Sequence, residues 1–222
     1  MEINVVQKVL KVNDELAEEV RGELRAAGVV TINIMSSPGS GKTTLIEKTL
    51  AAVQGTLRIG VIEGDPETSL DAERIARYDV PVTQIETAGG CHLEANLVKR
   101  ALSGFDLPSL DLLIIENVGN LVCPASFDLG ENAKVVMVST TEGHDKPAKY
   151  PNMFRRADVI ILNKMDLLPH VDFDFERFRD YVQKLNPGAP LIDMSCKTGE
   201  GLDAWLLWID EEIAQVTARQ AT

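Results

Sequence analysis

The stretch SSPGSGKTT at residues 36–44 decides the fold. It follows the apolar run VVTINIM at 29–35 and precedes the helix-period segment TTLIEKTLAAV at 43–53. A glycine-rich loop between a strand and a helix is typical of phosphate binding, because its backbone N–H groups and the helix N-terminus attract anions. The sequence therefore predicts a phosphate-binding loop at this position.

Five residues of the loop have a predicted role toward a nucleotide. Gly39 and Gly41 let the backbone turn its N–H groups inward, and Lys42 places an ammonium group on the β- and γ-phosphates. Thr43 offers its hydroxyl to Mg²⁺, and Thr44 reaches the α-phosphate. This division of roles predicts a P-loop nucleotide triphosphatase.

Position 36 departs from the strict P-loop pattern, which has glycine where this chain has Ser36. Serine can also make the turn, and Ser40, between the two glycines, is predicted to bind phosphate with them. The alternative is a glycine-rich turn that caps a helix and binds no ligand. The order of strand, loop and helix favours phosphate binding.

Short runs rich in Val and Ile continue along the chain and alternate with helix-period segments. Their lack of polar alternation predicts a parallel sheet with both faces covered. We expect a three-layer α/β P-loop fold with a mostly parallel sheet, forming a single domain over 1–222, with residues 1–28 as a helical segment packed on it. The further predicted strands cover 57–62, 111–116, 134–139, 158–164 and 189–194.

The two ends of the chain predict amphipathic helices. Asn13 is expected to cap the first helix, which ends at Gly28. In the last helix, LDAWLLWIDEEIAQV at 202–216, Trp205 and Ile209 share one face and are expected to pack in the core.

Composition excludes several classes of function. The formal net charge of -12 disfavours nucleic acid as a partner. The first residues do not resemble a secretory signal, and no apolar run is long enough to span a membrane. Three cysteines indicate a reducing compartment rather than a disulfide framework. We expect a cytoplasmic protein without membrane partners.

Two later motifs predict guanine as the base. In NKMD at 163–166, the carboxylate of Asp166 can accept hydrogen bonds from guanine N1–H and its exocyclic amine, which adenine lacks on that edge. Asn163 is expected to reach the other edge of the base, with the Lys164 stem along the ring. SCK at 195–197 follows another apolar strand and brings backbone amides toward O6. The predicted base-binding residues are Asn163, Lys164, Asp166, Ser195, Cys196 and Lys197.

Carboxylates at two predicted strand ends point to Mg²⁺. Glu116 ends the apolar run DLLIIE, where a carboxylate is costly unless it lies near a cation. Gly119, three residues later, is expected to contact the γ-phosphate. Asp65 is the second magnesium carboxylate, with a helix-capping turn as its alternative role. We predict Lys42, Asp65 and Glu116 as catalytic residues, and Thr43, Asp65 and Glu116 as magnesium ligands.

Cys91, His92 and Cys123 are candidates for a second metal site. Two thiolates and an imidazole suit a soft or borderline ion such as Ni²⁺ or Zn²⁺. Without further context, scattered cysteines in a chain of this type are more often ordinary residues.

Several long motifs together resemble one family, the hydrogenase nickel-incorporation GTPases of the HypB type within the SIMIBI class of P-loop GTPases. The resemblance covers nearly the whole chain. The motifs that carry it are MSSPGSGKTT at 35–44, EGD at 63–65, TAGGCHLEA at 87–95, ENVGNLVCPA at 116–125, EGHDKPAKYP at 142–151 and NKMD.

The resemblance implies a metallochaperone that binds and hydrolyses GTP to GDP and helps insert nickel into hydrogenase. It assigns Ni²⁺ or Zn²⁺ to Cys91, His92 and Cys123, with the site completed at a homodimer interface controlled by GTP and metal. Cys123 follows the segment predicted to sense the γ-phosphate, so hydrolysis can move a metal ligand. The implied partners are a nickel-binding accessory protein of the HypA type and the hydrogenase large subunit precursor.

Some features depart from parts of the family. There is no N-terminal cysteine cluster and no histidine-rich tract, so we expect neither the separate high-affinity nickel site nor the nickel storage seen in parts of the family. His144 is interpreted as a solvated residue rather than a fourth ligand, and Lys146 and Lys149 can reach the nucleotide or the other subunit. No glutamine is placed to orient water beside Glu116, so slow hydrolysis is expected.

Other functions remain open at this point. An accessory GTPase for urease or for a cobalamin-dependent mutase has the same phosphate-binding loop and also works as a nucleotide-controlled dimer. The motif ENVGNLVCP argues against both. A small-molecule P-loop kinase would not need NKMD and SCK. A metal-binding adaptor with a purely structural nucleotide site would show no turnover.

Overall fold

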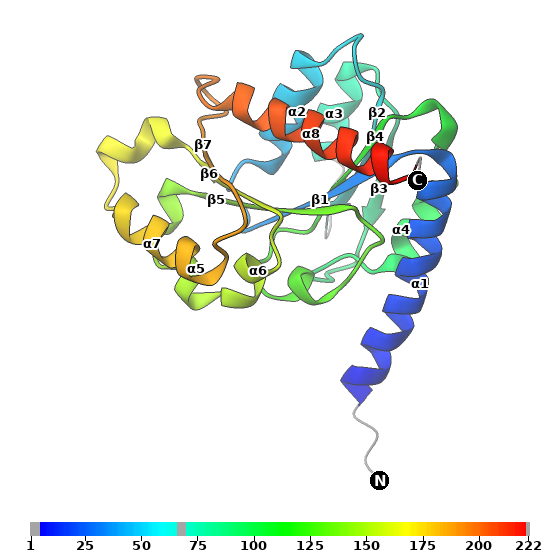
Figure 1. Ribbon diagram of the computed structural model, residues 1–222, viewed down its shortest axis with the longest axis horizontal. Helices are drawn as coiled ribbons and strands as arrows, with labels where there is room; N and C mark the ends of the chain where they lie inside the picture. The colour runs from blue at the N-terminus through cyan, green and yellow to red at the C-terminus, as the bar shows by residue number, and fades with distance from the viewer. Residues whose placement is uncertain (1–4, 66–69, 221–222) are drawn as a thin grey trace.

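The computed structural model describes residues 5–65 and 70–220. Its centre is a seven-stranded sheet in the order β3-β2-β4-β1-β5-β6-β7 (Figure 1). Every neighbouring pair is parallel, which confirms the predicted α/β class. The strands are β1 (Val30–Ser36), β2 (Ile59–Asp65), β3 (Val82–Glu86), β4 (Leu112–Glu116), β5 (Ala133–Ser139), β6 (Val159–Asn163) and β7 (Leu191–Asp193).

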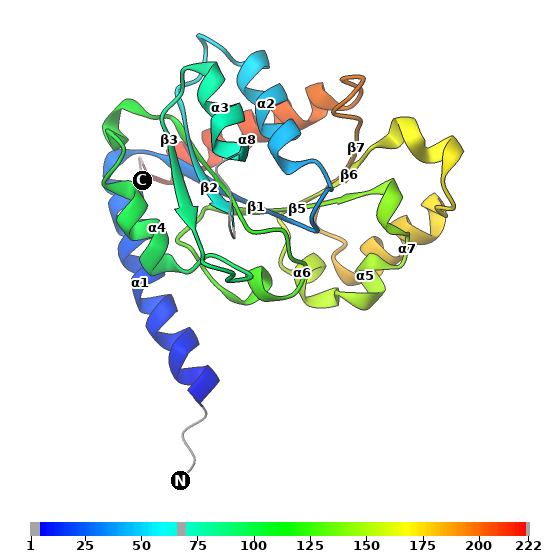
Figure 2. The same cartoon turned by 180° about the vertical axis from the view of Figure 1, so that it is seen from behind.

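Helices cover both faces of the sheet, so the fold has three layers. One face carries α2, α3 and α8, and the other carries α1, α4, α5, α6 and α7 (Figures 1 and 2). No helix within the described residues has the length and apolar character to cross a membrane. The helices are α1 (Val5–Ala27), α2 (Lys42–Ala52), α3 (Leu70–Ile75), α4 (Ala95–Leu102), α5 (Lys146–Lys149), α6 (Pro151–Arg155), α7 (Phe175–Leu185) and α8 (Leu202–Gln220).

The near-continuous apolar strands follow from this layering. In β1, Ile32 and Ile34 pack in the core beneath α2 and α8, whereas Met35 packs in the core beneath α6 and α7. Successive side chains of a strand point to opposite faces, so a strand covered on both sides needs apolar residues throughout. The prediction of two covered faces is confirmed.

The closing helix α8 is tied to the helix that follows the phosphate loop. Trp205 is fully buried, and its indole Nε1–H donates to Thr49 Oγ1 of α2 at 2.9 Å. Its ring stacks on Trp208 with centroids 5.3 Å apart. Trp205 and Ile209 pack in one core, as their spacing predicts.

The first helix differs from its sequence prediction. Helix α1 starts at Val5, so Asn13 lies inside it and does not cap it. The Asn13 side chain is buried and bonds two other segments, donating to Asp128 O at 2.8 Å and accepting from Ala95 N at 2.9 Å. Residues 1–4 of the predicted 1–28 segment lie outside the described residues.

The carboxyl ends of the parallel strands meet at one edge of the sheet. Strand β1 leads into the phosphate loop, β2 ends at Asp65, β4 at Glu116 and β6 at Asn163. In open parallel sheets ligands bind at this edge. The predicted nucleotide residues, although far apart in sequence, are therefore brought to one side of the molecule.

Candidate nucleotide site and metal cluster

A cavity of about 500 Å³ opens above the phosphate loop. Gly39, Gly41, Lys42, Thr43 and Thr44 line it from the loop and the start of α2. Lys42 is the first residue of that helix, so the helix N-terminus and its partial positive charge face the cavity. This arrangement suits a polyphosphate.

Close packing explains why glycine is required at position 41. Gly41 has a φ of 109°, and a Cβ there would lie 2.6 Å from Asn163 Nδ2. The Asn163 amide also donates to Ser40 O at 2.8 Å. The end of β6 thus holds the phosphate loop directly.

Serine at position 36 fits the loop without a left-handed backbone, since Ser36 is not among the positive-φ residues. Its buried hydroxyl donates to Ser37 O at 2.7 Å and accepts from Ser40 Oγ at 2.6 Å. These two hydrogen bonds hold the first residues of the phosphate loop in place. They account for serine, instead of glycine, at position 36.

Two buried carboxylates lie beside Lys42. Lys42 Nζ is 3.6 Å from Glu116 Oε1, which also accepts from Thr43 Oγ1 at 3.0 Å. Glu63 is the register partner of Glu116 on the neighbouring strand β2. Burial, followed by the charge of Glu116, raises the pKa of Glu63 to about 11. Burial also raises the pKa of Glu116, against the opposing effect of Lys42.

This carboxylate pair fits Mg²⁺. Glu63 Oε1 and Glu116 Oε2 are buried and have no hydrogen-bond partner among the described residues, and both residues line the phosphate cavity. Such oxygens are the ligands that Mg²⁺ prefers, together with a hydroxyl and phosphate oxygens. Asp65 lines the same cavity. Thr43, Asp65 and Glu116, the predicted ligands, therefore stand with Glu63 around one space.

Gly119 is close to the phosphate loop. A Cβ at this position would lie 3.0 Å from backbone atoms of Pro38, and both residues line the cavity. The segment after β4 thus contacts the loop where the phosphates are expected, and the contact of Gly119 with the γ-phosphate stays a prediction.

A second cavity of about 450 Å³ adjoins the first. Gly41, Thr44 and Lys164 line both cavities, so the two are continuous around the loop. The second is lined in addition by Lys48, Asn163, Asp166, Leu167, Cys196 and Lys197.

The predicted base-binding residues support one another in this second cavity. Asp166 Oδ1 accepts from Ser195 Oγ at 2.6 Å, and Lys197 Nζ lies 3.9 Å from Asp166 Oδ2. Lys164 has a left-handed backbone, with a φ of 62°, and its Nζ donates to Gly39 O at 2.7 Å. These contacts hold a carboxylate at the cavity wall, where it can accept from a base.

Asn163 also joins two segments of the protein. Its side chain is buried; Nδ2 donates to Ser40 O, and Oδ1 accepts from Cys196 N at 3.0 Å. Both groups of the amide thus bond protein, and because Nδ2 carries a second N–H, the contact with the base stays a prediction. Asn163 joins the phosphate loop to the SCK segment.

Three charged residues of the phosphate cavity are not apparent from the sequence motifs. Glu63 lies within EGD at 63–65, and a charged residue in an apolar strand is the signal that could identify it. Asp71 and Arg74 of α3 also line the cavity, and Arg74 donates to Thr44 Oγ1 at 3.3 Å. No local pattern marked them, because only the fold brings α3 to the loop.

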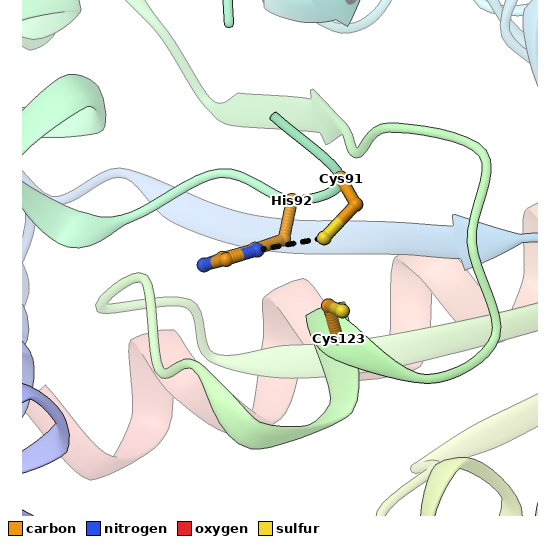
Figure 3. Close-up of side chains that lie close together, drawn as sticks. All are labelled: Cys91, His92 and Cys123. Carbon is orange, nitrogen blue, oxygen red and sulfur yellow. Dashed lines mark hydrogen bonds between the residues drawn. The ribbon is translucent and has the colours of Figure 1, made fainter. Parts of the chain in front are cut away.

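Cys91, His92 and Cys123 form a cluster on the other side of the segment after β4. Their ligand atoms all lie within 4.8 Å of one another, and the side chains point toward a common space (Figure 3). Cys91 Sγ is 3.5 Å from His92 Nδ1. Neighbouring ligands of a tetrahedral metal stand roughly 3.6 Å apart, so a small contraction would complete three corners of a site.

The electrostatics of the cluster suit a metal ion. Burial lowers the pKa of His92, so its imidazole is neutral near pH 7. The neighbouring Cys91, followed by burial, raises the pKa of the Cys123 thiol. The His92 ring packs on Phe127 at 3.9 Å, and its buried Nε2 has no hydrogen-bond partner within the part of the chain that the structure describes. A cation would remove the cost of bringing two thiolates together.

The cluster is built from two segments of the backbone. Helix α4 begins at Ala95, so Cys91 and His92 lie in the loop before it. Asn120 Nδ2 donates to Cys91 O at 3.2 Å, which ties this loop to the segment carrying Cys123. Cys91 and His92 therefore come from the loop before α4, and Cys123 is the first residue of a short 3-10 helix, Cys123–Ser126.

Three residues that the sequence singled out lie away from the cluster. His144 packs edge-on against Phe173, 6.1 Å between centroids, and its Nδ1 accepts from Asp174 N at 3.4 Å. Lys149 pairs with Asp145, and Lys146 lies over the Tyr150 ring at 5.5 Å. Neither lysine lines either nucleotide cavity.

Known proteins share this architecture and sequence. The family model described as CobW/HypB/UreG, nucleotide-binding domain, matches residues 30–193. Hydrogenase maturation factor HypB of Azotobacter chroococcum mcd 1 is 48% identical over 210 residues, covering 95% of this chain and 69% of that protein. The probable HypB of Methanocaldococcus jannaschii is 40% identical and covers 96% of this chain and 97% of its own length.

Two solved structures agree closely with the fold. HypB from Archaeoglobus fulgidus superposes with a TM-score of 0.86 at 42% identity, covering 91% of this chain and 99% of that one. HypB from Helicobacter pylori, solved in complex with nickel, gives 0.88 at 39% identity, with 91% and 95% covered.

These matches define a P-loop GTPase, and the chain belongs to the CobW/HypB/UreG family. Within that family it falls in the HypB group, whose members match it over nearly its whole length.

Proposed function

We propose that this protein is a GTP-hydrolysing nickel metallochaperone that helps insert nickel into nickel-containing hydrogenase. The observation that carries the proposal is the short segment from Glu116 to Cys123. Its first residue lines the phosphate cavity, and its last belongs to the Cys91, His92 and Cys123 cluster. One loop thus connects a nucleotide site to a candidate metal site.

The nucleotide chemistry follows from the residues around the phosphate loop. Lys42 and the N-terminus of α2 neutralise the β- and γ-phosphates, and the Asp166 carboxylate selects guanine. Thr43, Asp65 and Glu116, with Glu63, would hold Mg²⁺, which supplies charge stabilisation during phosphoryl transfer. None of the described residues that line the phosphate cavity is a glutamine that could orient water, so intrinsic hydrolysis is slow and requires dimerisation or a partner.

Nickel is the cargo in this proposal. Cys91 is exposed and the cluster offers three ligands, so a fourth position is open to a second subunit or to a receiving protein. We propose that GTP favours a homodimer that holds the metal and that hydrolysis releases it. A nickel-binding accessory protein of the HypA type delivers the metal, and the hydrogenase large subunit precursor receives it, all in the cytoplasm.

A second recipient has one observation in its favour. The relative from Helicobacter hepaticus, 42% identical over 217 residues, carries the name hydrogenase/urease maturation factor HypB. An additional role in urease maturation is therefore the alternative. Parallel delivery assays to the two apoenzymes would distinguish them.

The test measures Ni²⁺ and Zn²⁺ binding together with oligomeric state, in GDP and in a non-hydrolysable GTP analogue. Wild-type protein should show metal-dependent dimerisation favoured by the analogue, and Cys123→Ala should lose it. Equal metal affinity and equal mass in both nucleotides would overturn the metallochaperone proposal. Turnover of GTP to free phosphate, without an acceptor, tests the hydrolysis separately.

A further inference from the structure

A buried amide lies between the nucleotide cavity and the metal cluster. Asn117 follows Glu116 at the end of β4 and is 1% exposed. Its Oδ1 accepts from Leu93 N at 3.1 Å, and Leu93 directly follows His92. The same oxygen accepts from Val118 N, which lines the phosphate cavity, at 3.0 Å. One side chain thus bonds both loops.

The other end of the amide is anchored in the core. Asn117 Nδ2 donates to Asn33 Oδ1 of β1 at 3.2 Å, and Asn33 Nδ2 donates to Glu131 Oε1 at 3.2 Å. Both Asn33 and Glu131 are buried. A buried polar network of this kind has few alternative arrangements, because each unmade bond costs about 1–3 kcal/mol.

The hydrogen bonds of Asn117 connect the phosphate cavity to a metal-ligand loop that the backbone of the Glu116–Cys123 segment does not reach. The chain from Gly119 to Cys123 connects the phosphate side to one metal ligand covalently. Cys91 and His92 belong to a different loop, 24 or more residues earlier. Two side chains of the segment after β4 bond that second loop: Asn120 bonds Cys91 O from beyond Gly119, and Asn117 bonds Leu93 N from directly beside Glu116. Asn117 is therefore the link nearer to the phosphate cavity.

We propose that Asn117 is a positioning residue that transmits the nucleotide state to the Cys91–His92 half of the metal cluster. This inference rests on the proposed function, since it names the residue through which GTP controls metal affinity. A shift of the segment after Glu116 would move Cys123 through the backbone and Cys91 and His92 through Asn117. All three metal ligands would then change position together when the bound nucleotide changes.

Asn13 provides a matched control. It is also a buried asparagine that holds the cluster, because it bonds Ala95 N and Asp128 O, which follow the two ligand-bearing segments. Neither of its side-chain bonds reaches the segment from Glu116 to Gly119. Its loss should loosen the cluster without affecting transmission.

The experiment measures the Kd of Zn²⁺ and, separately, of Ni²⁺ for the full chain with GDP and with a non-hydrolysable GTP analogue. The ratio of the two Kd values is the coupling, typically about 5–150-fold between linked sites. In Asn117→Ala the ratio should fall at least about fivefold toward one, while GDP affinity stays within about twofold. Asn13→Ala should weaken metal binding equally in both states and keep the ratio.

Two other outcomes would contradict the proposals. A wild-type ratio of one would overturn the proposed function and this inference with it. A normal wild-type ratio that Asn117→Ala retains, or that Asn13→Ala loses equally, would overturn only the role of Asn117.

Two further measurements keep the inference testable if Asn117→Ala does not fold. Asn117→Ser leaves a smaller void and should show the same loss of coupling. Hydrogen exchange of the Leu93 amide needs no variant: its rate in wild-type protein should differ between GDP and the analogue, and identical rates would contradict the inference.

Discussion

Glu63 and Glu116 stand side by side on the parallel strands β2 and β4, both almost fully buried. Adjacent strands lie about 4.8 Å apart, so two charges at one register position repel strongly. Lys42 is the cation that approaches Glu116, at 3.6 Å. The pair therefore costs free energy until another cation or a proton arrives.

Glu63→Gln should stabilise the nucleotide-free, metal-free protein. Its raised pKa means that the folded state holds a proton that the unfolded chain releases above about pH 4.5, so stability falls as pH rises from there toward 11. Glutamine carries no such proton. We expect a gain of about 1 kcal/mol or more at pH 8, or roughly 2–4 °C in Tm, measured by thermal denaturation across pH.

The matched control for Glu63 is Glu86→Gln on the neighbouring strand β3, where the side chain is exposed. It should leave the pH profile unchanged. A Glu63→Gln variant with wild-type Tm at both pH 5 and pH 8 would show that the carboxyl is not buried as described.

Cys123→Ser should reduce Ni²⁺ and Zn²⁺ affinity by at least about 100-fold, because it removes one of three ligands and a thiolate charge. Isothermal titration with GDP present measures the loss. Cys196→Ser is the control, since Cys196 is buried beside the base cavity and away from the cluster. Equal losses in both variants would argue against a site at Cys91, His92 and Cys123.

Metal affinity should rise with pH between about 6.5 and 9. The metal displaces thiol protons, and the raised pKa of Cys123 keeps that proton bound at neutral pH. His92 has a lowered pKa and is already neutral there, so it adds no further slope. Apparent Kd values in a pH series measure the trend, and a flat series would contradict thiolate ligation.

Asp166→Asn should weaken GDP binding by about 100-fold and leave ADP binding unchanged. The variant loses the acceptor pair that guanine requires, while Asn can still bond Ser195. Fluorescent nucleotide titration measures both constants. Asp172→Asn, an exposed aspartate outside the cavity, should bind both nucleotides as wild type does.

Ala88→Gly should stabilise the fold by about 1 kcal/mol. Ala88 has a φ of 51°, a left-handed conformation that glycine adopts without steric cost. Urea denaturation measures the change. The midpoint urea concentration should rise, and the m-value should stay constant. A decrease in stability would mean that the loop before Cys91 has a different backbone.

The parts of the fold that the sequence predicts are those with continuous apolar runs. Strands β1, β2, β4, β5 and β6 are such runs, buried on both faces. Strand β3 has no such run: its VTQIE places polar Thr83 and Gln84 beside each other at the sheet edge, so periodicity did not reveal it. Only pairing with β2 defines it.

The site could be predicted where a short motif carries its own chemistry. Lys42 and Asp166 stand in such motifs, whereas the metal role of Cys91, His92 and Cys123 was expected only from the resemblance to a family. Arg74 and Asn117 have roles set by tertiary contacts across 30 or 24 residues, which local sequence does not encode. For the same reason the capping role expected of Asn13 was wrong, since its partners lie on other segments.

The stacked indoles of α8 have a spectroscopic consequence. Trp205 and Trp208 are the two tryptophans of the chain, and Trp205 donates to Thr49 in the helix that begins at Lys42. Intrinsic emission therefore originates on the face that carries α2, opposite the α1 and α4 layer. Quenching or a spectral shift of the tryptophan emission should therefore report nucleotide exchange directly. Metal binding at Cys91, His92 and Cys123 should change this emission only indirectly, because the sheet lies between the cluster and the two indoles.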